Sequence, residues 1–257
     1  MYVDSFEELQ AATTEMLGIF EPVERAVRAP TDPRTFHPDQ APYIADESRG
    51  GVTVQIERGI AAVSNYNAIL TLYAQGESLS NLEESASKLS ASVGVLGTSL
   101  GLPVVGPSFT AGVEGLQAIA SALLSVSDRV EFANLVLEQS AAIDGFLVEL
   151  RDLTPDMFRS AVTYVDQRKI ALGLEGRARE IPTLDDDLEH FRKMLASWVL
   201  AIDNARESIS ALEVAVAVED GGLGSNIDAV TFWTDELNRH TEAIKFAARS
   251  ISAAFTQ

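Results

Sequence analysis

The residues that could carry metal chemistry in this sequence are histidines placed near carboxylates. His190 lies three residues after Asp187, and His240 lies four residues after Glu236, so each pair would share one face of a helix. Such pairs supply ligands in metal-binding helical bundles, together with acids that project into the core from further helices. The core positions of the neighbouring segments are apolar, so a carboxylate/histidine metal-binding bundle is our third-ranked hypothesis. His37 lies among prolines, where we expect an exposed loop.

The sequence contains no recognisable set of residues for acid–base or nucleophilic catalysis. Adjacent acids such as Glu83 and Glu84 belong to a set of 38 acidic residues, and we expect them on solvated helix faces. General acid–base catalysis needs a concave, partly desolvated site, and no part of the sequence marks one. The chain lacks cysteine and lacks the glycine-rich and serine motifs of nucleotide-binding proteins and hydrolases. We therefore predict a protein that is not an enzyme, with no catalytic residues and no cofactor.

The net negative charge of the chain limits the classes of partner that it could bind. With 19 basic and 38 acidic residues the formal net charge is -19, which would repel the phosphates of nucleic acids. A protein partner or self-association is our preferred expectation, and a membrane is the alternative. The compartment stays open: the cell envelope or the outside of the cell if a signal peptide has been removed, and otherwise the cytoplasm.

Repeated apolar positions predict the elements that would position any site. Few prolines and sparse aromatic residues favour helix over strand. Apolar residues alternate at spacings of three and four along residues 52–100, 110–153, 184–216 and 227–255, which is the pattern of packed heptad helices. Gly76 is the one point where the first of these tracts could break. The fold class we predict is all-α: an elongated bundle of five or six helices with two long antiparallel helical hairpins.

The organisation along the chain follows from where prolines and glycines interrupt these tracts. We divide it into an N-terminal helix (1–28), a proline-rich extended segment (29–51), a long helical hairpin with an apolar tip (52–153), and C-terminal helices that complete the same bundle (154–257). Ser5 with Glu8 predicts a capping box at the start of the first helix, and Pro22 should kink or split it. Thr154 before Pro155 predicts an N-cap for a later helix.

The most unusual feature is a loss of charge around the tip of the first predicted hairpin. Between Lys88 and Asp128 the only charged residue is Glu114, although 22% of the chain is charged. Either other helices cover this region and its small residues allow close helix packing, or it is a surface that contacts a protein or a membrane. The candidate contact residues are Leu100, Leu102, Pro103, Val104, Val105, Pro107 and Phe109.

Long helices joined by an apolar hairpin resemble the architecture of α-helical pore-forming toxins, over residues 52–153 only. That resemblance implies a membrane-active protein whose apolar tip inserts in lipid. The serine- and threonine-rich arms of the tip and the acidic charge of the chain argue against insertion. The function we favour is therefore that of a non-enzymatic structural or protein-interaction module, with the membrane-active protein as the alternative.

Overall fold

The structure is a computed structural model, and all of its regular elements are helices. It describes residues 2–28, 34, 36, 38, 51–77, 82–97, 106–123, 129–217, 227–252 and 255. The α-helices are α1 (Tyr2–Arg28), α3 (Gly51–Ala74), α4 (Glu83–Gly97), α5 (Pro107–Leu123), α6 (Arg129–Arg151), α7 (Thr154–Leu174), α8 (Ile181–Ala217) and α9 (Ile227–Ser250). The short 3-10 helix η3 (Ala178–Glu180) joins α7 to α8. The prediction of an all-α protein is confirmed.

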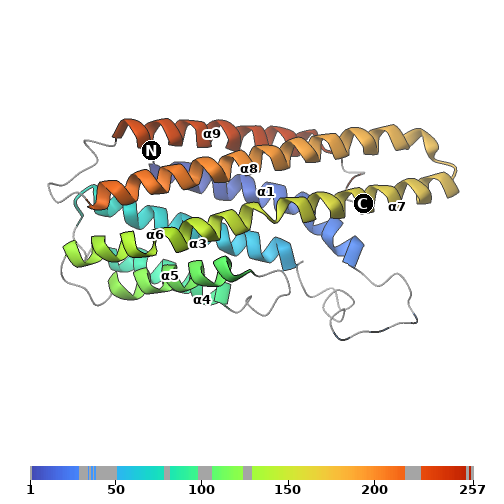
Figure 1. The fold of residues 1–257 in the computed structure, drawn as a ribbon. Helices are drawn as coiled ribbons and strands as arrows, with labels where there is room; N and C mark the ends of the chain where they lie inside the picture. Colours follow the sequence, from blue (N-terminus) through green and yellow to red (C-terminus); the bar gives the residue numbers. More distant parts are fainter. Residues whose placement is uncertain are drawn as a thin grey trace.

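The helices form an elongated bundle organised around α8 (Figure 1). The antiparallel helix α9 lies along one side of α8, while α6 and α7 follow one another along another side. Helix α1 packs against α3, α7 and α9, and α4 and α5 gather at one end of the bundle. The heptad seam of α8 supplies much of the core, because Phe191, Trp198, Ile202 and Leu212 are all fully buried.

The prediction of five or six helices with two long hairpins is not confirmed, because the helices are shorter and more numerous. The tract expected over 52–100 is divided into α3 and α4, which pack against one another. Gly76 ends α3 with a φ of +88°, and the amides of Gly76 and Glu77 donate to the carbonyls of Tyr73 and Leu72. This is the Schellman closure that glycine favours, and it reverses the chain. The tract expected over 110–153 is likewise two packed helices, α5 and α6.

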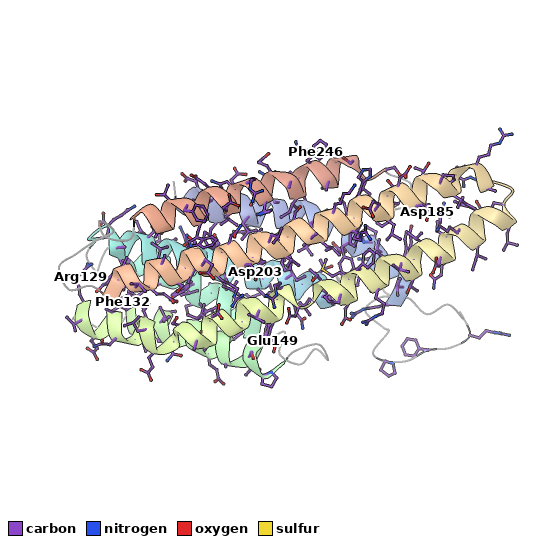
Figure 2. The ribbon with its side chains drawn as sticks, turned by 45° about the horizontal axis from the view of Figure 1, so that its top comes forward. Arg129, Phe132, Glu149, Asp185, Asp203 and Phe246 are labelled. Carbon is purple, nitrogen blue, oxygen red and sulfur yellow. The ribbon has the colours of Figure 1, made fainter. Side chains whose placement is uncertain are left out.

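Arg129, the first residue of α6, holds the end of α3. Its guanidinium lies 3.9 Å from the centre of the Tyr73 ring and donates to the carbonyl oxygens of Tyr73 and Glu77. The Tyr73 hydroxyl donates in return to the Arg129 carbonyl at 2.6 Å. A cation at the C-terminal end of a helix is favoured by the helix dipole, so this contact fixes α6 against α3 near one end of the bundle (Figure 2).

Two predicted helix starts were wrong. Ser5 is buried inside α1, which already begins at Tyr2, and Glu8 pairs with Lys245 of α9 instead of closing a capping box. The cap of α7 is Leu153, which makes no side-chain hydrogen bond. Thr154 instead donates to the Arg151 carbonyl at 2.8 Å. Proline has no N–H to donate, so Pro155 cannot bond the Arg151 carbonyl four residues back, and the threonine hydroxyl takes its place. Pro22 does not split α1, which is one helix through this position.

Buried acids hold two helix ends from neighbouring helices. Glu24 of α1 accepts hydrogen bonds from the backbone amides of Val52 and Thr53 at the start of α3, at 3.0 and 3.1 Å. Asp187 of α8 accepts from the backbone amide and hydroxyl of Ser252, just after α9. Both acids are at most 2% exposed, so each replaces water as the partner of polar groups inside the bundle.

Candidate functional site

Most of the predicted contact residues cannot be placed. Leu100, Leu102, Pro103, Val104 and Val105 lie outside the described residues. Pro107 is the exposed first residue of α5. Phe109 is a correction: it is 3% exposed, and its ring centre lies 4.8 Å from that of Phe146 on α6. It faces α6 from the inner side of α5 and is therefore a core residue.

Close packing accounts for part of the charge depletion. At Gly112 of α5, an added Cβ would lie 2.2 Å from the Cβ of Phe146 on α6. Leu89, Val93 and Leu96 of α4 are buried between α3 and α5. These contacts require small or apolar residues, whatever the function of the region.

The outer side of α4 and α5 is nevertheless poor in charge. We call the exposed and partly exposed positions of residues 89–96 and 106–123 the charge-poor surface; Glu114 is its single charged residue. A shallow groove of about 460 Å³ lies between the two helices and is lined by Val93, Gly94, Val113, Glu114, Gln117, Ala118 and Ser121. This surface is the part of the predicted apolar tip that the structure describes.

Phe246 of α9 is an exposed apolar side chain with charged neighbours. Phe246 projects from the outer side of α9 and is 75% exposed (Figure 2). The charged residues Glu242 and Arg249, one helical turn to either side of it, are also exposed. A single exposed apolar residue among charges is common on soluble proteins, so this position marks no contact surface.

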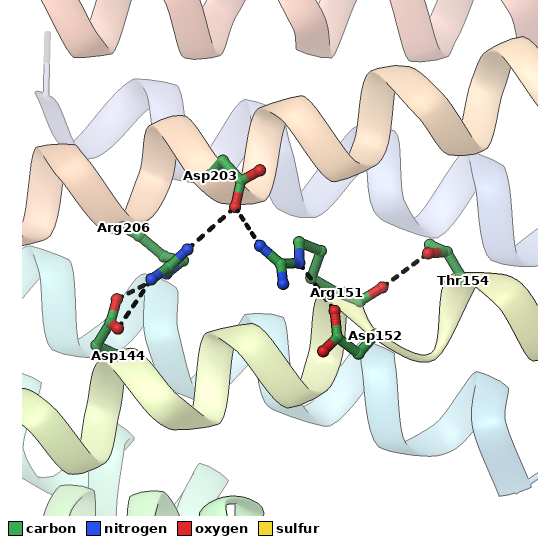
Figure 3. Close-up of polar contacts among 6 residues, drawn as sticks. All are labelled: Asp144, Arg151, Asp152, Thr154, Asp203 and Arg206. Carbon is green, nitrogen blue, oxygen red and sulfur yellow. Dashed lines mark hydrogen bonds and ion pairs between the residues drawn. The ribbon is translucent and has the colours of Figure 1, made fainter.

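A network of ion pairs links α6 to α8 (Figure 3). Arg206 donates to both carboxylate oxygens of Asp144, at 2.6 and 2.9 Å, and to Asp203 at 3.1 Å. Asp203 also accepts from Arg151, which in turn binds Asp152. Both arginines are therefore engaged by aspartates at the surface between the two helices.

A pocket of about 390 Å³ adjoins this network between α6 and α8. The buried carboxyl of Glu213 lies in its wall and accepts hydrogen bonds from the Tyr66 hydroxyl at 2.8 Å and the Ser140 hydroxyl at 2.5 Å. Burial raises the pKa of Glu213, the two hydroxyls oppose that rise, and the nearby charge of Asp144 adds to it. Burial, with the charge of Glu213, also raises the pKa of Tyr66 well above its usual value. Glu213 is not among the residues that the sequence predicted for a site.

The carboxylates proposed to join the histidines are engaged elsewhere. Asp187 binds Ser252, and Glu236 accepts from Arg239. Burial and the positive charge of Arg239 lower the pKa of His240. Among the described residues, no group of three or more histidines and acids could hold a metal ion. His37 lies outside them.

No helix in the described part of the chain is long and apolar enough to cross a membrane. Comparison of the chain with protein families, curated proteins and solved structures finds no match.

Proposed function

We propose that this chain is a non-enzymatic helical interaction module that associates with a second copy of itself through the charge-poor surface of α4 and α5. The observation that carries the proposal is the contrast between this surface and the whole chain. Two copies that each carry a net charge of -19 repel one another over most approaches. The charge-poor surface is a place where two copies can meet with a single acid, Glu114, on each side.

The shape and composition of the surface also suit a second helix pair. Gly94 and Ala118 line the groove and leave little side-chain volume above the backbone, and an added Cβ at Gly94 would meet no atom within 4 Å. A helix ridge from a second copy can therefore enter the groove between α4 and α5. In a two-fold dimer the same surface is used on both copies, so one charge-poor surface serves both sides of the interface.

A charge introduced at the centre of this surface should prevent association. We expect Gly94→Glu to shift the protein toward monomer in sedimentation equilibrium, because each dimer would bury two new carboxylates in a groove that already contains Glu114 and has no cation among its lining residues. Gly18→Glu on α1 is the matched control, since Gly18 is also an exposed helical glycine at which an added Cβ would meet no atom within 4 Å. A wild-type protein that is monomeric at all concentrations contradicts the proposal, and so does equal dissociation in the two variants. If the monomeric wild type also bound neutral or anionic vesicles, the membrane-active alternative would be favoured.

Ionic strength provides an independent test. Salt at about 0.5 M reduces the Debye length to a few ångströms, compared with roughly 14 Å at 0.05 M. Repulsion between the acidic bodies would then fall while the apolar contact persists. We expect the dimer of the wild-type chain to tighten as salt increases, by sedimentation or light scattering. A dimer that dissociates as salt is added would instead depend on ion pairs, and the charge-poor surface would not be its interface.

A further inference from the structure

Among the described residues, no cation pairs with the buried carboxyl of Glu213. Glu213 is 3% exposed, and its carboxyl accepts hydrogen bonds from the neutral hydroxyls of Tyr66 and Ser140. The nearest arginine in the pocket wall, Arg206, is directed to Asp144 and Asp203. Transfer of an ionised carboxylate from water to such a site is costly unless a cation accompanies it or the group takes up a proton.

Two hydroxyl donors do not use all the acceptor capacity of a carboxylate. Each carboxylate oxygen has two lone pairs, so each Glu213 oxygen can accept one more hydrogen bond beside the one that it has. A ligand that brings both a positive charge and N–H donors would meet both needs of this group.

The rest of the pocket indicates what kind of cation would fit. Its volume of about 390 Å³ lies within the range of roughly 300–1,000 Å³ that is usual for small-molecule sites and is large for a bare metal ion. Leu137, Ala141, Leu147 and Ile209 supply apolar walls between Glu213 and the Asp144–Arg206 pair. Asp144 and Arg206 in the same wall pair with each other, which leaves Glu213 as the acid available to a ligand. Apolar walls beside such an acid suit an alkyl chain that ends in an ammonium.

We infer that the pocket between α6 and α8 binds a small primary alkylammonium compound, whose ammonium donates to the carboxylate of Glu213 and whose alkyl chain lies against Leu137, Leu147 and Ile209. This inference is independent of the self-association proposed above, because α4 and α5 contribute no residue to the pocket. It assigns to the bundle a ligand site that the sequence did not indicate.

The test is the affinity of the full-length chain for n-butylammonium, measured by calorimetry or by chemical-shift titration. We expect saturable binding to the wild type and an affinity reduced roughly tenfold or more in Glu213→Gln, the effect of losing one charge-assisted hydrogen bond. Glu207→Gln is the matched control, because it removes the same charge from an exposed position of α8 and should leave the affinity unchanged. Tetramethylammonium, which has no N–H donor, should bind more weakly than n-butylammonium.

A second variant keeps the inference testable if Glu213→Gln alters the fold. Ala141→Phe places a ring in the pocket from an exposed position of α6 and leaves Glu213 intact, so it should also block binding. The inference is overturned if the wild type shows no saturable binding at millimolar n-butylammonium. It is also overturned if Glu207→Gln and Glu213→Gln reduce binding equally, since that would indicate attraction to the acidic surface alone, or if tetramethylammonium binds as tightly as n-butylammonium.

Discussion

Glu24→Ala will lower the free energy of unfolding by about 3 kcal/mol, because it leaves buried amides at the start of α3 without acceptors. The carboxylate of Glu24 accepts from the amides of Val52 and Thr53 and from the Thr53 hydroxyl, at 2.8–3.1 Å. Val52 and Thr53 are themselves buried, so water cannot replace the lost acceptor without opening the contact between α1 and α3. Urea unfolding followed by circular dichroism measures the change.

Two further variants distinguish the loss of the Glu24 cap from the loss of a negative charge on α1. Glu24→Gln retains one acceptor oxygen and should lose less stability than Glu24→Ala, since one amide keeps a partner. Glu21→Ala removes an acid of the same helix whose contact with Arg25 lies near the surface, and its cost should stay within about 0.5 kcal/mol. If Glu24→Ala and Glu21→Ala were equally mild, the amides of α3 would have to find other acceptors, and Glu24 would not be the cap.

Gly112→Ala and Gly94→Ala should change stability in opposite directions. The new methyl at Gly112 would meet the Cβ of Phe146 at 2.2 Å and the carbonyl oxygen of Ala142 at 3.0 Å. Neither atom belongs to the flexible end of a side chain, so α5 and α6 must separate. We expect a loss of about 2 kcal/mol, the usual cost of overpacking.

At Gly94 the added methyl meets no atom within 4 Å, and the residue lies inside α4. Alanine should therefore stabilise this helix by roughly 0.5–1 kcal/mol through its higher helix propensity. Thermal and urea unfolding of the two variants provide the comparison. Stabilisation by Gly112→Ala would show that the approach of α5 to α6 is looser than the structure places it.

The heptad spacing predicted the helical class and the buried face of α8 correctly, but it could not locate the breaks in the tracts over 52–100 and 110–153. The same spacing of three and four continues on both sides of a turn when both helices face one core, even where the register shifts. Gly76 marked one of these breaks, because the residue that ends a helix with a positive φ is usually glycine. The division of α5 from α6 had no comparable signal that we recognised.

The buried acids were missed, although their spacing contains a signal. Glu213 lies four residues after Ile209 and three before Val216, and both of these neighbours are buried. Asp187 lies between the buried Leu184 and Phe191, and Glu24 lies between the buried Phe20 and the partly buried Val27. An acid on the apolar face of a helix must find donors in the core, so such positions point to caps or binding sites. Their partners come from other helices, and the sequence alone does not identify them.

The contact between the first and last helices has a consequence for synthesis on the ribosome. Glu8 of α1 pairs with Lys245 of α9, 237 residues later, and α1 packs along α9 over much of its length. Because domains fold as their segments emerge, the apolar stripe of α1 stays without this neighbour until almost the whole chain has been made. Folding of this bundle should therefore be completed late, and a nascent chain stalled before α9 should bind chaperones that recognise exposed apolar helices.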